Sequence, residues 1–378
     1  MAAGTGDGAV TPLAALLQAE IAAKGPLPVA GVMAAALHHP RFGYYAGSEA
    51  AATGPLGRCG DFITAPEVSQ VFGEVLGAWC VRVWQAMGAP RPVVLAELGP
   101  GRGTLLADLW RTIAAVAPDL ADAARLHLVE VSGALREQQR SAIAALAAPP
   151  RTVWHESLAA VPPGPALVLA NEFFDALPVE QYVRDAGVWW QRCVDSRDGV
   201  LAFSLGLAVD SRERPDLADL PDAPDGTLVE RCPEAERLAA DLGARVATNG
   251  GAALIIDYGP ARSTPGETLQ ALRHHRPADL LASLGQADLS HHVDFERLAQ
   301  AVTSAGGRAW GPVPQGLFLG RLGVAERGAA LGAAAPEQMD AISGAIRRLV
   351  HPGRMGLLFK ALAVTPRMAP AAPPGFGR

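Results

Sequence analysis

A glycine-rich turn is the strongest chemical signal in the sequence. Residues 97–103 read Glu-Leu-Gly-Pro-Gly-Arg-Gly and separate an apolar run from a helical pattern. Glycines at Gly99, Gly101 and Gly103 let the backbone turn sharply and approach a ligand that a Cβ atom would exclude. The spacing is G-x-G-x-G, whereas the turn that binds a dinucleotide pyrophosphate is G-x-G-x-x-G. The turn therefore predicts a small-molecule site with Glu97 at its entrance, and a purely structural tight turn is the alternative.

A second carboxylate follows the next apolar run along the chain. Glu130 lies near the end of residues 126–131, which have the composition of a buried strand. A carboxylate at the carboxyl edge of such a strand can accept hydrogen bonds from both hydroxyls of a ribose. We expect Glu130 to bind a nucleoside beside the glycine turn. A solvated surface glutamate is the alternative.

Further polar residues follow the buried run 166–170. Asn171, Glu172 and Asp175 come directly after it, and the carboxyl ends of parallel strands meet at one edge of a sheet. Carboxylates there could orient an acceptor group, and a guanidinium matches them well because its donors form a bidentate fork. The alternative is that Glu172 and Asp175 cap a helix, since helix N-termini favour acidic residues.

A polar group in the N-terminal region precedes a long helical pattern. Asp61, Thr64 and Glu67 crowd one helix entrance, and we expect the segment 60–70 to close over the ligand as a lid. Thr64 and Glu67 also have the spacing of a capping box, which alone could explain both residues.

Two histidines in the second half of the chain are candidates for proton transfer. His275 and His292 could accept a proton or orient the acceptor, because imidazole titrates near neutral pH. A structural role is the alternative for each. Their neighbours His274 and His291 are expected to be exposed.

The hydrophobic periodicity predicts the elements that position these residues. Buried strands are expected at 92–98, 126–131, 166–170 and 252–257, and a hairpin at 179–183 and 188–194. Helical spacing occurs at 12–24, 29–38, 66–87, 104–116 and 135–146. Strands that alternate with helices predict an α/β fold with a mostly parallel, doubly wound sheet.

This pattern also predicts a division of the chain. We expect an N-terminal helical extension and lid at 1–90, and a core in two parts, 91–184 and 244–365. Between them, 185–243 is expected to be an insertion, because 210–226 is acidic and rich in proline as in an exposed loop. We expect this insertion to contribute to substrate binding. The Pro-rich tail 366–378 is expected to be disordered.

Composition excludes several classes of partner. A net charge of −6 and a pI near 5.9 give no electrostatic reason to expect nucleic acid. The four cysteines form no C-x-x-C pair, which argues against a structural metal site and a disulfide framework. No leader and no apolar run long enough for a membrane span are visible. These features predict a cytoplasmic protein, and the Trp- and Leu-rich helical faces leave a homodimer open.

Several long motifs resemble those of one family. An acid before the glycine turn and an acid after the second strand are typical of class I methyltransferases, which bind S-adenosyl-L-methionine. Narrower motifs resemble the MidA family. They are Gly-Tyr-Tyr at 43–45, Gly-Asp-Phe-Ile-Thr-Ala-Pro-Glu at 60–67, the glycine turn, Asn-Glu-Phe-Phe-Asp-Ala-Leu-Pro at 171–178, Asp-Tyr-Gly at 257–259, Thr-Leu-Gln at 268–270, His275, Asp-Leu at 288–289, His-Val-Asp-Phe at 292–295 and Met-Gly at 355–356.

The resemblance implies a fold and an activity. It implies a Rossmann-like class I methyltransferase sheet with an N-terminal helical extension and an insertion. The implied cofactor is S-adenosyl-L-methionine, bound by Asp61, Thr64, Glu67, Glu97, Gly99, Gly101, Gly103, Glu130 and Asn171. The family includes a mitochondrial assembly factor of respiratory complex I that methylates an arginine, so the implied partner is a protein such as a complex I subunit. Glu172, Asp175, His275 and His292 are then the candidate catalytic residues.

Two other functions compete with this interpretation. A noncatalytic assembly protein could retain the pocket for stability, but such a protein could have lost the glycines and Glu130. A nicotinamide oxidoreductase is disfavoured, because the glycine spacing is one residue too short.

Overall fold

A seven-stranded sheet forms the centre of the part of the chain that the computed structural model describes, residues 10–45, 63–210, 212, 214 and 217–377. Its strands run in the order β14-β15-β10-β5-β2-β3-β4. All neighbours from β10 to β4 are parallel, and β15 is antiparallel to both β10 and β14. The strands are β2 (Val93–Leu98), β3 (Ala124–Val129), β4 (Thr152–His155), β5 (Ala166–Asn171), β10 (Gly251–Tyr258), β14 (Gly307–Pro314) and β15 (Phe359–Pro366).

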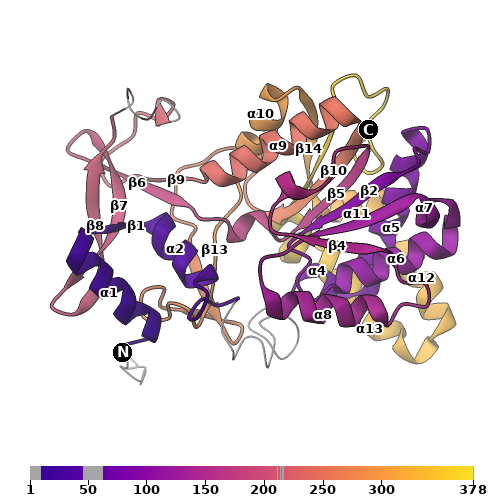
Figure 1. Cartoon of the computed structure of the whole chain (residues 1–378), viewed down its shortest axis with the longest axis horizontal. Coiled ribbons are helices and arrows are strands. Elements are labelled where there is room, and N and C mark those ends of the chain that lie inside the picture. Colours follow the sequence, from indigo (N-terminus) through magenta and orange to yellow (C-terminus); the bar gives the residue numbers. More distant parts are fainter. Residues whose placement is uncertain (1–9, 46–62, 211, 213, 215–216, 378) are drawn as a thin grey trace.

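Helices cover both faces of this sheet (Figure 1). One face packs against α5 (Gln70–Ala86), α6 (Thr104–Val116), α7 (Pro118–Ala123), α8 (Gly133–Ala144), α11 (Gln315–Arg321), α12 (Val324–Ala334) and α13 (Met339–Val350). The other face packs against α9 (Pro233–Asn249) and α10 (Phe295–Ser304). The inner strands are buried on both sides, which explains why β5 is apolar from Ala166 to Ala170.

The functional edge of the sheet follows from the strand order. The chain passes from β2 to β3 on one side, and β5 pairs with β2 on the other. In an open α/β sheet, this reversal opens a crevice at the carboxyl ends of the strands, where ligands bind. The glycine turn follows β2, and Glu172 follows β5.

A smaller lobe is assembled from three separate parts of the chain. It contains α1 (Pro12–Lys24), α2 (Val29–His38) and an antiparallel sheet of β1 (Leu27–Pro28), β6 (Glu180–Asp185), β7 (Val188–Arg197), β8 (Val200–Ala208) and β9 (Leu228–Arg231). A second antiparallel sheet adds β11 (Gln270–Arg273), β12 (Arg276–Ala278) and β13 (Asp288–Ser290). Leu17, Met33, Val194 and Leu289 share one apolar core, which explains why the three parts fold together.

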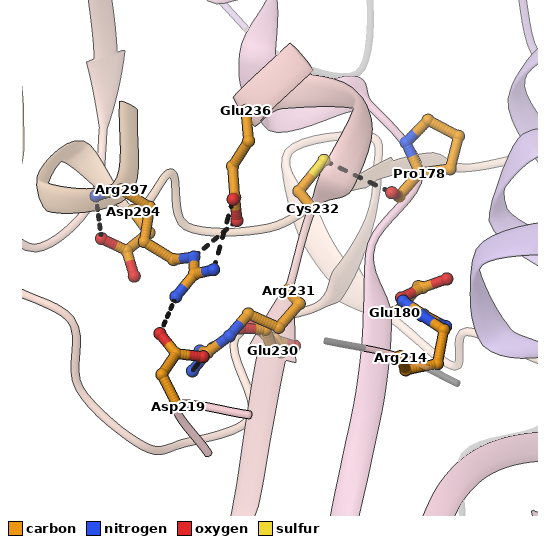
Figure 2. Close-up of polar contacts among 10 residues, drawn as sticks. All are labelled: Pro178, Glu180, Arg214, Asp219, Glu230, Arg231, Cys232, Glu236, Asp294 and Arg297. Atoms are coloured by element: carbon orange, nitrogen blue, oxygen red, sulfur yellow. Dashed lines mark hydrogen bonds and ion pairs between the residues drawn. The ribbon is translucent and has the colours of Figure 1, made fainter. Parts of the chain in front are cut away.

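Ion pairs join the lobe to the core where β9 runs into α9 (Figure 2). Arg297 of α10 binds both carboxylate oxygens of Glu236 on α9 and also donates to Asp219. The Cys232 thiol donates to the carbonyl oxygen of Pro178, at 3.3 Å between sulfur and oxygen. Bidentate pairs of arginine with carboxylate fix geometry as well as charge, so Glu236 holds Arg297 in place, and the Asp219 contact of the same arginine ties the lobe to α10.

The domain boundaries expected from the sequence change in four places. The antiparallel sheet begins at Glu180 rather than 185, and α9 packs on the core through Leu242 and Val246 rather than belonging to the insertion. The stretch 269–290 joins the lobe rather than the second part of the core. Within the N-terminal extension, α5 belongs to the core, because Trp79 is fully buried there.

The C-terminal tail was expected to be disordered, and its described residues are instead packed. The Trp79 indole donates to the carbonyl oxygen of Pro374 at 3.1 Å, and Phe376 lies against Phe318 with ring centroids 5.2 Å apart. The proline-rich composition predicted disorder, but the packing of Phe376 on Phe318 holds this segment against the core. None of the described helices is long and apolar enough to cross a membrane.

The long helix expected at 66–87 is split. A short α4 (Ala65–Val68) ends at Ser69, whose φ of −162° and ψ of 134° are extended. The Ser69 hydroxyl caps α5 by accepting from the amide of Val71 at 3.2 Å. Single-turn 3-10 helices occur at Leu158–Ala160, Phe174–Ala176 and Pro336–Gln338, and a π-helix at Pro352–Gly356.

Candidate functional site

The glycine turn bends in a conformation that favours glycine at three positions. Gly99, Gly101 and Gly103 have φ angles of 60°, 52° and 84°. A Cβ atom on Gly99 would also lie 2.5 Å from the Phe173 ring. Backbone in this region is strained for residues with a side chain. The turn needs its glycines for shape as well as for access to a ligand.

A cavity of about 570 Å³ lies above this turn, between the core and the lobe. The ends of β2, β3 and β5 form its floor, and α2 and α4 contribute walls. Its lining includes most of the residues that the sequence singled out: Thr64, Glu67, Glu97, Gly99, Gly101, Glu130, Asn171 and Glu172. Strands far apart in the sequence thus converge on one site.

Two polar atoms at the cavity are buried without a hydrogen-bond partner among the described residues. They are Oε2 of Glu97 and Oδ1 of Asn171. Glu97 is only 4% exposed, and burial raises the pKa of its carboxyl to about 8. Buried polar groups are normally satisfied, so both atoms point to a ligand that carries donors or positive charge.

Glu130 is held in place by backbone and side-chain donors. Its Oε1 accepts from the amide of Ser132 at 2.8 Å, and its Oε2 accepts from Nε2 of Gln139 at 3.2 Å. Burial raises the pKa of its carboxyl, and these donors oppose that rise. The carboxylate is therefore oriented toward the cavity at the end of β3.

Gln139 was missed by the sequence reasoning. It is completely buried, and its Nε2 also donates to the carbonyl oxygen of Gly101 at 2.8 Å. Its Oε1 accepts from the Trp154 indole at 2.8 Å. One amide thus joins the glycine turn, Glu130 and β4. A polar residue on the apolar side of the pattern 135–146 was the only signal available.

The segment expected to form a lid is fixed to both sides of the site. The Thr104 hydroxyl donates to Oε1 of Glu67 at 2.6 Å, and the amide of Ala65 donates to Oε1 of Glu172 at 2.8 Å. The capping box expected for Thr64 and Glu67 is wrong, because Thr64 makes no side-chain bond at the start of α4 and Glu67 is bound to Thr104. Asp61 lies outside the described residues.

The carboxylates after β5 have different surroundings. Glu172 lies on the cavity wall, where Asn171 also donates to its Oε1 at 3.1 Å. Its φ of 49° is unusual for a residue with a side chain. Burial raises the pKa of both Glu172 and Asp175 to about 7. Asp175 is not in the cavity lining, and the nearby Tyr258 hydroxyl partly opposes the rise in its pKa.

Asp257 explains how this turn is held. Its Oδ2 accepts from the backbone amides of Phe173, Phe174 and Asp175 at 3.2, 2.9 and 3.3 Å. The side chain is completely buried at the end of β10. Asp257 therefore caps the turn that presents Glu172.

The histidines are not brought to the cavity. His275 lies exposed in the turn between β11 and β12, so its position gives no support to a catalytic role. His292 stacks edge-on against Tyr258, with ring centroids 5.4 Å apart, and lies outside the cavity lining. The exposure expected for His291 is wrong, because His291 is 2% exposed and its ring nitrogens lie 3.0 Å from two carbonyl oxygens.

Other residues reach the cavity without having been expected there. His38 and Tyr45 come from the lobe, Glu156 follows β4, and Glu234 begins α9. Tyr45 lay within a family motif but carried no expected role. The assembly of the lobe from three chain segments was not visible in the sequence, so neither were these walls. Within the described residues, no cluster of His, Cys, Asp or Glu side chains is placed to hold a metal ion.

The raised pKa of Glu97 makes stability depend on pH. Below pH 4.5, its ordinary pKa, the carboxyl is protonated in both the folded and the unfolded chain, and its burial then causes no loss of stability through ionisation. Between pH 4.5 and about 8 only the unfolded chain ionises freely, so stability falls as pH rises. We expect Glu97→Gln to raise the melting temperature at pH 8 and to leave it nearly unchanged at pH 5, as measured by calorimetry without ligand.

Burial also raises the pKa of Glu172 and Asp175, so these carboxyls likewise make stability fall as pH rises. Glu97→Gln should therefore remove only part of the dependence of the melting temperature on pH. The matched control is Glu137→Gln, since Glu137 is 71% exposed on α8. An unchanged slope in Glu97→Gln would show that Glu97 is solvated rather than buried without a partner.

Comparisons with known proteins agree with this geometry. Residues 75–313 match the model of a family described as "Putative S-adenosyl-L-methionine-dependent methyltransferase". The chain is 36% identical to the protein arginine methyltransferase NDUFAF7 homolog of Drosophila melanogaster, over 94% of this chain and 85% of that protein. It is 33% identical to NDUFAF7 of Homo sapiens, over 94% and 84%.

A solved structure matches the whole fold. A protein from Burkholderia thailandensis, crystallised with S-adenosyl-homocysteine, superposes with a TM-score of 0.84 at 30% identity and covers 97% of this chain and 94% of its own. The resemblance, the α/β fold and the cofactor expected from the sequence are thus confirmed. The cytoplasmic location is overturned, because the curated relatives are named as mitochondrial proteins.

Proposed function

The chain belongs to the MidA family of S-adenosyl-L-methionine-dependent methyltransferases, and from this premise we propose that it methylates an arginine side chain of a protein. The curated relatives, which are named protein arginine methyltransferases, support the choice of acceptor. One observation carries the proposal: a single cavity contains both the glycine turn and the Glu172 carboxylate. A site for a nucleoside and a site for a cation therefore share one space.

The cofactor half of the cavity fits a cationic nucleoside. When bound, S-adenosylmethionine supplies a methyl group on a positively charged sulfur. Glu130 is oriented to accept from the ribose hydroxyls, and Gly99 and Gly101 give the ligand room at the backbone. Gly103 lies outside the cavity lining and faces α8. The buried Glu97 and Asn171 oxygens that lack a partner are matched by the donors of an amino acid moiety.

The acceptor half depends on Glu172. Its Oε1 accepts from Ala65 and Asn171, which fixes the carboxylate and leaves Oε2 to face an arginine. Glu172 then holds the guanidinium in line, and positioning of this kind supplies much of the rate of a transfer reaction. With a pKa near 7, Glu172 also accepts the proton that the nitrogen loses once it carries the methyl group.

The remaining candidates have supporting roles in this proposal. Thr64 and Glu67 form the wall that closes on the cofactor, and Asp175 supports the Glu172 turn from the Tyr258 side. His275 and His292 have no contact with the cavity that would give them a step. The protein substrate, by the family resemblance, is a subunit of respiratory complex I. A homodimer stays a prediction.

Two measurements test this function in sequence. Isothermal titration with S-adenosylmethionine and with NAD, side by side, should show binding of the first only. Labelled methyl transfer into a lysate that lacks the protein, followed by mass spectrometry, should place the label on arginine. Cofactor binding without any labelled protein would favour the noncatalytic assembly role, and label on another residue type would replace the acceptor.

A further inference from the structure

The charged groups around the cavity are mainly acidic. Six glutamates line it, against one arginine and one histidine. Three of them are committed, since Glu67 accepts from Thr104 and the cofactor accounts for Glu97 and Glu130. Glu172 lies on the acceptor side, and Glu234 lies at the start of α9, where the core faces the lobe. The acceptor side therefore carries more negative charge than one guanidinium needs.

Glu234 is the more accessible of these two carboxylates. Its side chain is 49% exposed, and within the described residues the cation beside it is Arg237, at 3.9 Å. Arg237 itself binds Asp241 at 3.0 Å. Glu236, two residues further along, accepts from Nε and Nη2 of Arg297 on α10 (Figure 2). The two glutamates thus differ, because Glu236 is held by a bidentate ion pair, whereas Glu234 has a long contact with Arg237 and lines the cavity.

The lobe contributes two aromatic rings to the cavity. His38 stacks on Tyr45 with centroids 5.8 Å apart, and both line the cavity from the lobe. The Tyr45 hydroxyl donates to Asp288 at 2.9 Å, which fixes the ring. Arginine side chains pack well on such faces, because the guanidinium is planar and weakly hydrated. An arginine that enters between α2 and the start of α9 would have these rings and Glu234 as neighbours.

We propose that the cavity accepts arginine from a basic segment of the substrate protein, and that Glu234 at the rim binds a second cation of that segment. This inference rests on the proposed function, since it names the class of protein that the same site accepts. Glu172 takes the target guanidinium, and Glu234 takes a lysine or arginine one or two residues away. The same acidic rim repels phosphate, which disfavours a nucleic acid as the occupant.

Peptide binding tests the proposal without depending on turnover. Three fluorescent peptides share one central arginine and carry lysine, alanine or glutamate beside it. Their affinity for the protein saturated with S-adenosyl-homocysteine is measured by anisotropy at low salt. The wild type should bind the lysine peptide about fivefold more tightly than the alanine peptide, the scale of one partly exposed ion pair. Glu234→Gln should reduce that preference to less than about twofold, and Glu234→Lys should reverse it.

The matched control is Glu137→Gln, which removes an exposed glutamate on α8 outside the cavity and should keep the wild-type preference. Full preference in Glu234→Gln would overturn the role of Glu234. Equal binding of all three peptides to the wild type, or no binding of any, would overturn the basic segment. Failure of the proposed function is separate, because it appears as absent arginine methylation in the lysate while the peptide preference can still be measured.

Discussion

Glu172→Gln should lower methyl transfer at least ~100-fold, the scale of losing one preorganised charged group from an active site. The change keeps size and one acceptor oxygen, so the bond from the Ala65 amide can persist. It removes the charge that would hold a guanidinium and the group that would take its proton. S-adenosylmethionine affinity should change less than ~10-fold, which single-turnover rates and titration would separate.

The pH profile gives this prediction a second readout. Burial raises the pKa of Glu172 to about 7, so the carboxyl is protonated below that pH and cannot accept a proton. The wild-type kcat/KM should rise with pH up to about 7 and then level. Glu172→Gln should lack that step in its remaining activity. If the variant kept wild-type turnover, the role of Glu172 would be limited to capping α4 through the Ala65 amide.

Asp175→Asn is the informative comparison. The sequence placed Glu172 and Asp175 together as holders of the acceptor, because both follow the same strand. The structure separates them, since Glu172 lines the cavity while Asp175 lies outside the lining, near Tyr258. We therefore expect a smaller loss in Asp175→Asn. An equal loss in both variants would mean that Asp175 reaches the substrate after all.

Local pattern was enough to predict the core and the cofactor side of the site. The helices Pro12–Lys24, Val29–His38 and Thr104–Val116 match their expected bounds, because each has continuous helical spacing and a clear end. The parallel strands β2, β3, β5 and β10 were visible as apolar runs, since both of their faces are buried. The parallel edge strand β4 was missed, because its side chains are partly exposed and it has no apolar run. Gly99, Gly101 and Glu130 follow strand ends and Glu97 lies near the end of β2, so the fold class alone predicts that they meet.

The acceptor side could not be predicted in the same way. His38 of the lobe and Glu234 of α9 line one cavity because the lobe, built from three distant segments, lies beside the core. No periodicity within one segment reports such a contact. The histidines show the opposite error: His275 has the right chemistry and a motif position, but the β11–β12 turn holds it in solvent. The chemistry of a residue type predicts a role only where the fold places that residue.

Gly101→Val should abolish S-adenosylmethionine binding while leaving the fold in place. Gly101 has a φ of 52° and lines the cavity, so a branched side chain there strains the backbone and enters the space of the ligand. Gly187 in the β6–β7 turn provides a matched control, because its φ is 75° and a Cβ there would meet no atom within 4 Å. Gly187→Val should carry a comparable backbone strain and bind normally.

The pair of variants separates strain from exclusion. Both should lower the melting temperature by a few degrees, since a positive φ costs a side-chain residue on the order of 1–2 kcal/mol. Only Gly101→Val should lose binding in titration. Glu130→Ala is an intermediate case, in which the binding free energy of S-adenosylmethionine should weaken by roughly 1–3 kcal/mol, the cost of a charged hydrogen bond left unmade. Unchanged affinity in a folded Gly101→Val would place the cofactor elsewhere, because a nucleoside held by Glu130 and the glycine turn has no room beside a valine.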